Sequence, residues 1–215
     1  MVPEHMEEDE ETPKSIPPWV ELEYAHMRIL AGSTSQVQFT HLSKSSCESL
    51  NSIFNASSSS NPGLSAFSCH QQGVVGLMKD LGVPIDQVCL LDPKAEKELS
   101  PEDGDGQFQW FLFGGILGDD PPRDRTSELR VHGFPTRHLG PIQMTTDTAL
   151  GVTTIVVHGR IPLQDIPYTD YPTIRFNAKE SVEMPFRYIA DGKEPRLPPG
   201  MKKLLYEDLN KGFDF

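Results

Sequence analysis

The segment Phe113–Thr126 reads FGGILGDDPPRDRT, and it is the stretch that decides how the rest of this 215-residue chain is interpreted. An apolar run from Phe108 to Leu117 leads into its glycines, and Asp119 and Asp120 follow directly. Glycine permits unusual backbone angles and lets a ligand approach the main chain closely. The segment therefore predicts a buried strand that ends in a ligand-binding turn, with an ordinary tight turn as the alternative.

The charge of this turn narrows the class of ligand. Two aspartates beside the glycines would repel a phosphate group, and no lysine follows the glycines as it does in a P-loop. The segment thus disfavours nucleoside triphosphates and dinucleotides. A cofactor that has a cationic centre and no phosphate fits better, and the sulfonium of S-adenosylmethionine is such a centre.

Two further segments have a similar arrangement. VCLLDPKA (Val88–Ala95) is a second bounded apolar run that ends in Asp and Pro, and RHLGPIQMTTDTA (Arg137–Ala149) is a Gly-Pro turn that leads to a helix start. Short apolar runs of this kind are typical of buried strands in a parallel sheet, where ligands bind at the carboxyl ends of the strands. We therefore expect an α/β domain. By spacing alone, the third segment is more typical of an ordinary capped helix than of a ligand-binding turn.

The remaining chain supports this organisation. Apolar spacing predicts helices over residues 19–30, 73–82 and 201–209 and a short strand over 35–39. The segment 149–158 is ambiguous, because its Thr, Ile and Val residues favour a strand while a capping sequence precedes it. Residues 43–72 are rich in serine and are expected to be a surface insertion, largely disordered or loosely docked. Recurrent prolines after residue 161 predict an extended tail, with a turn at Asp191 and Gly192.

Composition limits the partners. The formal net charge is −12, and such a surface repels nucleic acid and favours cationic partners. The three cysteines have no CxxC spacing, which indicates a reducing compartment. The sequence has no run of the length that a membrane span needs and no targeting signal, so a cytoplasmic location is expected. His5, His132 and His138 lack metal-ligand spacing, and no metal site is expected.

The three turn segments occur together with PEHMEE (Pro3–Glu8), WVELEY (Trp19–Tyr24) and MPFRY (Met184–Tyr188). In this combination the sequence resembles the SPOUT-type (α/β-knot) protein arginine methyltransferases of fungi and their archaeal relatives. The resemblance implies a SPOUT domain over residues 1–160, in which a deep trefoil knot is formed and the segment 145–158 is a helix. It also implies that the proline-rich extension 161–215 packs on this domain.

The resemblance implies a function as well: transfer of a methyl group from S-adenosylmethionine to an arginine of a small-subunit ribosomal protein. The cofactor would be held by three turns, and the positions that match them are Leu91, Asp92, Pro93, Phe113, Gly114, Gly115, Leu117, Gly118, Asp119, Leu139, Gly140, Gln143, Met144, Thr145 and Thr146.

Carboxylates are the side chains that this chemistry requires. Arginine has a pKa above about 12 and arrives charged, so acidic groups must hold its planar N–H donors and take up a proton as the methyl group arrives. The candidates, in order of preference, are Asp119, Glu4, Glu7, Asp147 and Glu23. Two alternatives remain at this point: a SPOUT RNA methyltransferase, and a binding module without enzymatic activity on a SPOUT scaffold. A monomer is expected rather than a homodimer, because the extension could cover the face through which SPOUT proteins usually dimerise.

Overall fold

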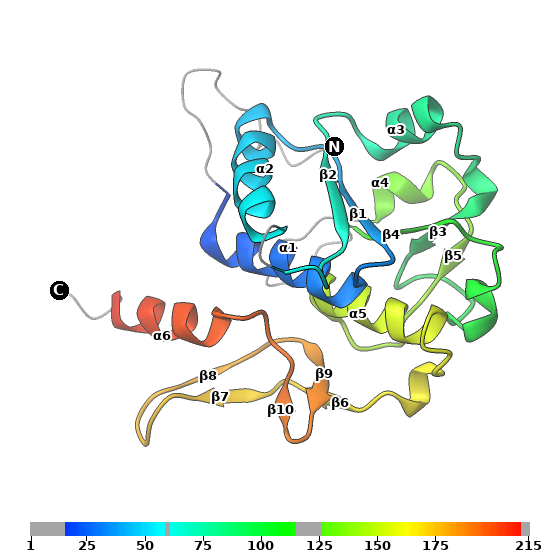
Figure 1. The fold of residues 1–215 in the computed structure, drawn as a ribbon. Coiled ribbons are helices and arrows are strands. Elements are labelled where there is room, and N and C mark those ends of the chain that lie inside the picture. Colours follow the sequence, from blue (N-terminus) through cyan, green and yellow to red (C-terminus); the bar gives the residue numbers. More distant parts are fainter. Residues whose placement is uncertain (1–15, 59–60, 115–125, 212–215) are drawn as a thin grey trace.

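The computed structural model describes residues 16–58, 61–114 and 126–211, and strands and helices alternate in most of its first part, up to residue 157 (Figure 1). The elements up to the first candidate turn are α1 (Pro18–Ala31), β1 (Gln36–Phe39), α2 (Lys44–Ser58), β2 (Ala66–Cys69), α3 (Val74–Leu81) and β3 (Val88–Leu91). The following elements are β4 (Trp110–Leu112), α4 (Ser127–Arg130), β5 (Thr136–Arg137) and α5 (Thr146–Val157). The last part contains β6 (Tyr168–Asp170), β7 (Thr173–Arg175), β8 (Ser181–Glu183), β9 (Arg187–Asp191), β10 (Glu194–Pro195) and α6 (Met201–Lys211).

The sheet that carries the candidate turns has the order β4-β3-β5, and all three strands are parallel. All four residues of β3 are buried, since it is the central strand, whereas the residues of the edge strand β4 are half-buried. The bounds of β3 coincide with the predicted apolar run Val88–Leu91. Of the longer predicted run Phe108–Leu117, the structure assigns Trp110–Leu112 to a strand, and residues 115–117 lie outside the described ranges. The expected α/β class with a parallel sheet is confirmed.

The expectation that residues 43–72 are largely disordered is wrong. Residues 44–58 form helix α2, and β2 pairs with β1 in parallel register, with Val37 opposite Phe67. Cys47, Leu50 and Phe54 have helical spacing, and Leu50 and Phe54 are fully buried in a cluster with Met27 of α1. One apolar stripe is enough to dock the helix, because the serines can occupy its other faces.

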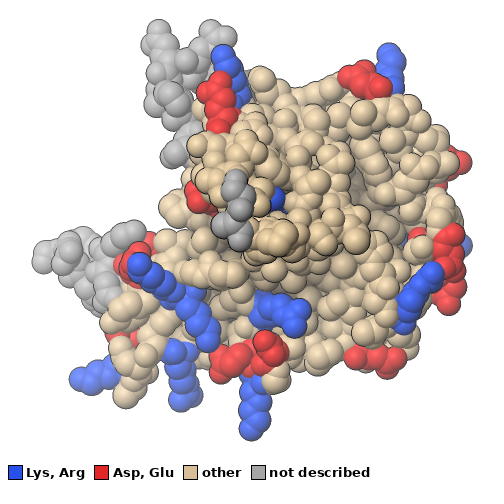
Figure 2. Space-filling view, in the orientation of Figure 1, with Lys and Arg blue, Asp and Glu red and all other residues tan. Residues whose placement is uncertain are grey.

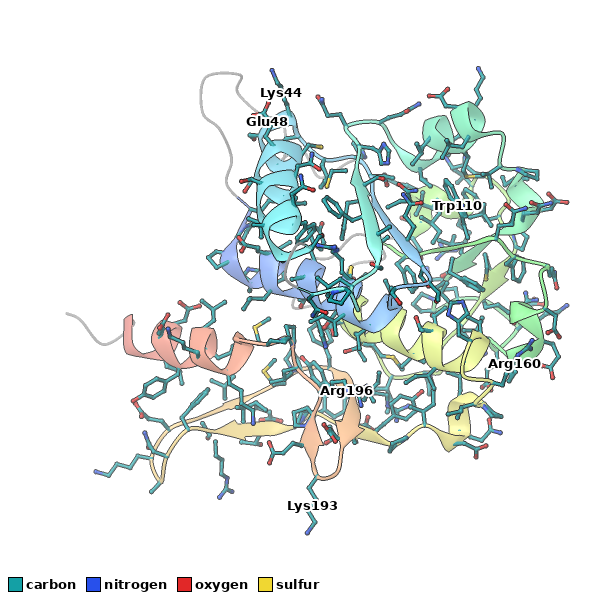
Figure 3. All side chains as sticks on the ribbon, viewed as in Figure 1. Lys44, Glu48, Trp110, Arg160, Lys193 and Arg196 are labelled. Carbon is teal, nitrogen blue, oxygen red and sulfur yellow. The ribbon has the colours of Figure 1, made fainter. Side chains whose placement is uncertain are left out.

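The outer face of α2 is polar and exposed, in agreement with a helix that is docked by one apolar stripe. Lys44 and Glu48 lie one turn apart at the start of the helix, with a separation of 4.0 Å between Nζ and Oε1, and both side chains are largely exposed (Figure 3). A helical ion pair of this kind contributes little to stability. The packing of Leu50 and Phe54 therefore holds α2 in place.

The ambiguous segment forms helix α5 at the centre of the molecule. Val152 and Val156 are fully buried there, and burial outweighs the strand propensity of β-branched residues. A Cβ atom at Gly151 would lie 3.0 Å from Leu30 of α1 and 3.1 Å from Ile189 of β9. This glycine therefore lets α1, α5 and β9 approach one another closely.

The part after residue 161 consists of two small antiparallel sheets, β10-β9-β6 and β7-β8, followed by α6. The predicted turn is confirmed, because Asp191 pairs with Glu194 across it and Gly192 has φ +62°. Ile189 packs in the same cluster as Val152, so this region adds to the main core and does not form a separate one. The predicted helix at 201–209 is also confirmed and extends to Lys211.

The described cysteines Cys47, Cys69 and Cys89 are free thiols, and Cys89 is fully buried. Among the described residues, no helix combines the length and the apolar character that crossing a lipid bilayer requires.

Candidate functional site

The three predicted cofactor turns begin at the same edge of the β4-β3-β5 sheet. In the register of the sheet, Leu90 lies opposite Leu112 and Leu91 lies opposite Arg137. Because parallel strands end on the same side, the segments that follow β3, β4 and β5 leave the sheet together. Their apolar side chains also meet: Leu91 belongs to one cluster, against which Phe113, Leu139 and Met144 pack. The structure thus brings together residues from all three turns.

The second turn can be followed only at its beginning. Phe113 and Gly114 are described, whereas Gly115, Leu117, Gly118 and Asp119 lie outside the described residues. The roles predicted for these residues stay predictions.

In the first turn the side chain of Asp92 has a definite structural role. Its carboxylate is buried and accepts hydrogen bonds from Arg130 Nε at 2.5 Å and Nη2 at 2.8 Å. Thr126 Oγ1 and the backbone N–H of Lys94 also donate to it, at 3.1 Å and 3.0 Å. The hydrogen bonds from Arg130 hold the pKa of Asp92 below its usual range. This carboxylate therefore ties the first turn to α4, so any cofactor contact from Asp92 must come mainly from its backbone.

The third turn is shaped by its backbone. Gly140 has φ +98°, a conformation that favours glycine, and its N–H donates to His138 Nδ1 at 3.1 Å. The C-terminal region fixes the other side of the turn, because the N–H of Arg187 in β9 donates to the carbonyl of Gln143 at 2.8 Å. The turn then enters α5, whose first backbone bond runs from Ala149 N–H to Thr145 O. The N–H groups of residues 146–148 thus have no acceptor within the helix, as at every helix start, and they face the end of the turn.

Two of the five predicted carboxylates are described, and they lie close together. Asp147 is in the first turn of α5, immediately after the third cofactor turn, and Glu23 is on α1. Burial, and secondarily the charge of Asp147, raises the pKa of Glu23 to about 8. Glu4, Glu7 and Asp119 lie outside the described residues, so their relation to this pair stays a prediction.

Two residues beside this pair were not among the predicted site residues. His26 Nδ1 lies 2.7 Å from Asp147 Oδ2, and both side chains are almost completely buried. Tyr188 of β9 is also buried, and burial together with the charges of Asp147 and Glu23 raises the pKa of its hydroxyl. His26 follows Glu23 by three residues and so shares its helix face, which is a signal that the sequence contained. Tyr188 stood in the quoted MPFRY motif, without a predicted role.

One further charged group at the edge of the sheet is paired. Arg137, at the end of β5, donates from Nε and Nη2 to the buried carboxylate of Asp103, with distances of 2.7 to 3.0 Å. Its guanidinium also lies 5.2 Å from the ring centre of Phe108. Within the described part of the chain, no three His, Cys, Asp or Glu side chains are grouped as metal ligands.

Cations on the visible surface alternate with acidic groups (Figure 2). Lys202 pairs with Glu194 at 3.0 Å, and Lys203 lies 3.6 Å from Glu207 on α6. Lys193 extends away from the body of the protein (Figure 3). On this face the positive charges therefore form no continuous strip of the kind that binds a phosphate backbone.

Comparisons with known proteins agree with this geometry. A family model described as "Protein arginine N-methyltransferase SFM1-like" matches residues 1–212. The protein arginine N-methyltransferase SFM1 of Saccharomyces cerevisiae (strain ATCC 204508 / S288c) is 48% identical over 149 residues, which are 66% of this chain and 69% of that protein.

Two solved structures of the yeast arginine methyltransferase SFM1 are similar over nearly the whole chain. The complex with SAM has a TM-score of 0.76 and 36% sequence identity, and the match covers 92% of this chain and 88% of that one. The complex with SAH has a TM-score of 0.75 at the same identity, with coverage of 90% and 91%.

Proposed function

The chain belongs to the SFM1-like family of protein arginine N-methyltransferases, and from this premise we propose that it methylates an arginine of a small-subunit ribosomal protein. The enzyme class and the cofactor S-adenosylmethionine follow from the family and from the similar structures with bound SAM and SAH. The SPOUT type of the fold agrees with the parallel sheet and its flanking helices. The trefoil knot and the ribosomal substrate are also part of the proposal. Both rest on the sequence resemblance to the SPOUT-type protein arginine methyltransferases.

One observation carries the proposal: three turns that are distant in sequence leave the same edge of one parallel sheet. Their described residues fit the cofactor. The third turn offers backbone N–H groups at the start of α5, the apolar side chains of Leu91, Phe113, Leu139 and Met144 pack beside it, and Asp147 supplies a carboxylate nearby. When bound, the cofactor supplies an electrophilic methyl group on a positively charged sulfur. The turns would orient that methyl group toward the arginine and exclude water from it.

The acceptor side of the reaction requires acidic residues. A guanidinium arrives charged and must lose one proton during the transfer. Glu4, Glu7, Asp119, Glu23 and Asp147 are the candidates for holding it, and the pair Glu23 and Asp147 is supported by its position beside the third turn.

The net charge of the chain supports a basic protein as the substrate. At −12, the electrostatic field favours a cationic partner over RNA. We propose accordingly that no nucleic acid is bound directly. We also propose that the enzyme works in the cytoplasm and that it is a monomer. A mass near twice 24 kDa in light scattering would contradict the monomer.

The test is a labelling experiment. The enzyme is incubated with S-adenosylmethionine that carries a labelled methyl group and with a ribosomal extract, and samples are then digested with nuclease or with protease. We expect the label to be lost only to protease and to be recovered as methylarginine after acid hydrolysis. Label that is lost only to nuclease would instead establish the RNA methyltransferase and exclude the proposed substrate.

A further inference from the structure

In the space between α1, α5 and β9, three buried polar side-chain atoms have no hydrogen-bond partner among the residues that the structure describes. They are Glu23 Oε2, Asp147 Oδ1 and Tyr188 Oη. Glu23 is 6% exposed, Asp147 1% and Tyr188 2%. The charges of Glu23 and Asp147 both raise the pKa of Tyr188, and the charge of Asp147 raises that of Glu23, so the three groups lie within electrostatic reach of one another. They form a single polar cluster inside an otherwise apolar interface.

Such a cluster is costly. Each buried acceptor without a partner loses about 1 to 3 kcal/mol of hydration, and native proteins contain few of them. In the described part of the chain, the packing next to the cluster is apolar, since Gly151, one turn after Asp147, brings the side chains of Leu30 and Ile189 together. A ligand that brings several donors would satisfy all three atoms at once.

The guanidinium group has the required donors. It is planar, carries five N–H groups and matches carboxylates with two parallel hydrogen bonds. The cluster is also in the right place, because Asp147 directly follows Thr146, the last residue of the predicted cofactor turn. A guanidinium held by Asp147 would therefore lie beside the cofactor.

We propose that Glu23 and Asp147 grip the guanidinium of the arginine that is methylated, that the hydroxyl of Tyr188 accepts a hydrogen bond from the same group, and that His26 is the positioning residue for Asp147. This inference rests on the proposed function and names its acceptor site. His26 fixes one oxygen of Asp147 through the 2.7 Å contact and leaves the other oxygen, Oδ1, for the substrate.

The transfer step is balanced within this arrangement. A lone pair of a guanidinium nitrogen forms the new bond to the methyl carbon, while the bond between carbon and sulfur breaks and its electron pair remains on sulfur. The sulfonium becomes a neutral thioether. The proton that the methylated nitrogen loses passes to the carboxylate of Glu23, so the product leaves as a methylated guanidinium cation.

Glu23 has the environment of a group that changes its protonation when arginine binds. Burial and the charge of Asp147 favour its neutral form, with a pKa of about 8, and its other titratable neighbours are Tyr24 and His26 on α1 and Tyr188 on β9. An arriving cation favours the ionised form. Binding of arginine should therefore release a proton from Glu23 near neutral pH. Because all three acceptor atoms are closed to solvent, binding also has to open the space between α1 and α5.

The test uses N-acetylarginine amide as the probe and N-acetylcitrulline amide as its neutral counterpart of the same shape. Both are titrated into the full chain in the presence of S-adenosylhomocysteine, by calorimetry at pH 7 in two buffers that differ in ionisation heat. The variants are Glu23→Gln, with Glu21→Gln on the same helix as the matched control. We expect the wild-type protein and Glu21→Gln to bind the arginine probe with release of up to one proton. Neither should bind the citrulline probe.

For Glu23→Gln we expect at least tenfold weaker binding of the arginine probe and no proton release, while its affinity for S-adenosylhomocysteine stays within about twofold. Unchanged arginine binding and proton release in Glu23→Gln would overturn the inference. If the unchanged protein labels no ribosomal protein but still shows binding that depends on Glu23, the proposed substrate fails and the acceptor site is supported.

His26 is tested by a conservative rescue. The amide of His26→Asn can place a donor near the position of Nδ1, whereas His26→Leu cannot. We expect His26→Leu to raise KM for the labelled ribosomal protein about tenfold or more and His26→Asn to restore most of that loss, with cofactor affinity similar in both. Equal KM values in the two variants would contradict the positioning role.

Discussion

The guanidinium of Arg130 holds the carboxylate of Asp92 with two hydrogen bonds, from Nε at 2.5 Å and from Nη2 at 2.8 Å. Asp92 stands at the end of β3 and Arg130 at the end of α4, so this contact joins the first cofactor turn to the helix that follows the second. The Asp92 side chain is only 2% exposed, while that of Arg130 is 31% exposed. The buried negative charge of Asp92 therefore depends on Arg130 for its compensation.

Arg130→Met should destabilise the protein by about 3 kcal/mol, because it leaves the buried carboxylate of Asp92 without its cation. Binding of S-adenosylmethionine should also weaken, since the first turn loses its attachment to α4. Urea denaturation and calorimetry check the two effects. Arg175→Met is the control: Arg175 is exposed on β7, and the variant should stay within about 0.5 kcal/mol of the unchanged protein. Equal stability of both variants would show that the pair is not needed.

Leu50→Ala should cost about 2 to 5 kcal/mol, as is usual for the removal of a fully buried leucine from a core. Ser52→Ala, two residues further along the same helix and exposed, should change stability by less than about 0.5 kcal/mol. Thermal unfolding of the two variants separates them. A loosely docked segment would instead tolerate both substitutions equally.

The serine-rich segment shows where composition misled the prediction. Nine serines in eighteen residues suggested disorder, yet Cys47, Leu50 and Phe54 already carried a helical period. The surface on which α2 docks, however, is built by α1, β1 and β2. A local sequence pattern does not reveal that such a surface will be present to bury a short apolar stripe. Strand β3 was simpler, because four consecutive apolar residues bounded by turn residues predict a buried strand without knowledge of its neighbours.

The candidate site divides in the same way. The three turns could be predicted, since each follows a recognisable strand or precedes a helix start, and parallel strands place such turns at one edge. The contact between His26 and Asp147 could not, because these residues are 121 positions apart and meet only when α1 packs on α5. The predicted cofactor contact of Asp92 ignored Arg130 for the same reason: the partner lies 38 positions away.

Arg28→Lys should destabilise the protein by about 2 to 4 kcal/mol although it keeps the positive charge. Arg28 is 2% exposed, and its donors reach the carbonyls of Phe54 and Ser65 and the hydroxyls of Ser57 and Ser58. Its guanidinium also lies 4.8 Å from the ring centre of Phe54 and 4.5 Å from that of Phe67. A lysine has three donors on a single nitrogen and cannot reproduce this planar arrangement. Denaturant midpoints for Arg28→Lys and for Lys79→Arg on the exposed side of α3 provide the comparison; a loss no larger than that of Lys79→Arg would contradict the role.

Gly140→Ala should weaken cofactor binding about tenfold and lower stability by about 1 to 3 kcal/mol, because the third turn requires φ +98° at this position. The space around Gly140 is open apart from Arg187 Nη1 at 4.0 Å, so the strain lies in the backbone and not in a collision. Gly73→Ala is the matched control, since Gly73 precedes α3 with φ −71° and has open space around it. Equal cofactor affinity in the two variants would show that the third turn tolerates a change of conformation.

Glu23→Gln should become more stable relative to the unchanged protein as the pH rises. Glu23 has a pKa of about 8 in the folded state against an ordinary value of 4.5. Between these two values, the folded state holds a proton that the unfolded chain has already released. Each pH unit in that window therefore removes up to about 1.4 kcal/mol from the stability of the unchanged protein, and glutamine has no such proton to lose. Urea unfolding at pH 5, 6.5 and 8 should give a difference that grows by a few kcal/mol, while Glu21→Gln should show a constant one. Parallel stability curves for Glu23→Gln and the unchanged protein would mean that Glu23 is ionised in the folded state, and the cluster would then lack the proton that arginine binding is expected to release.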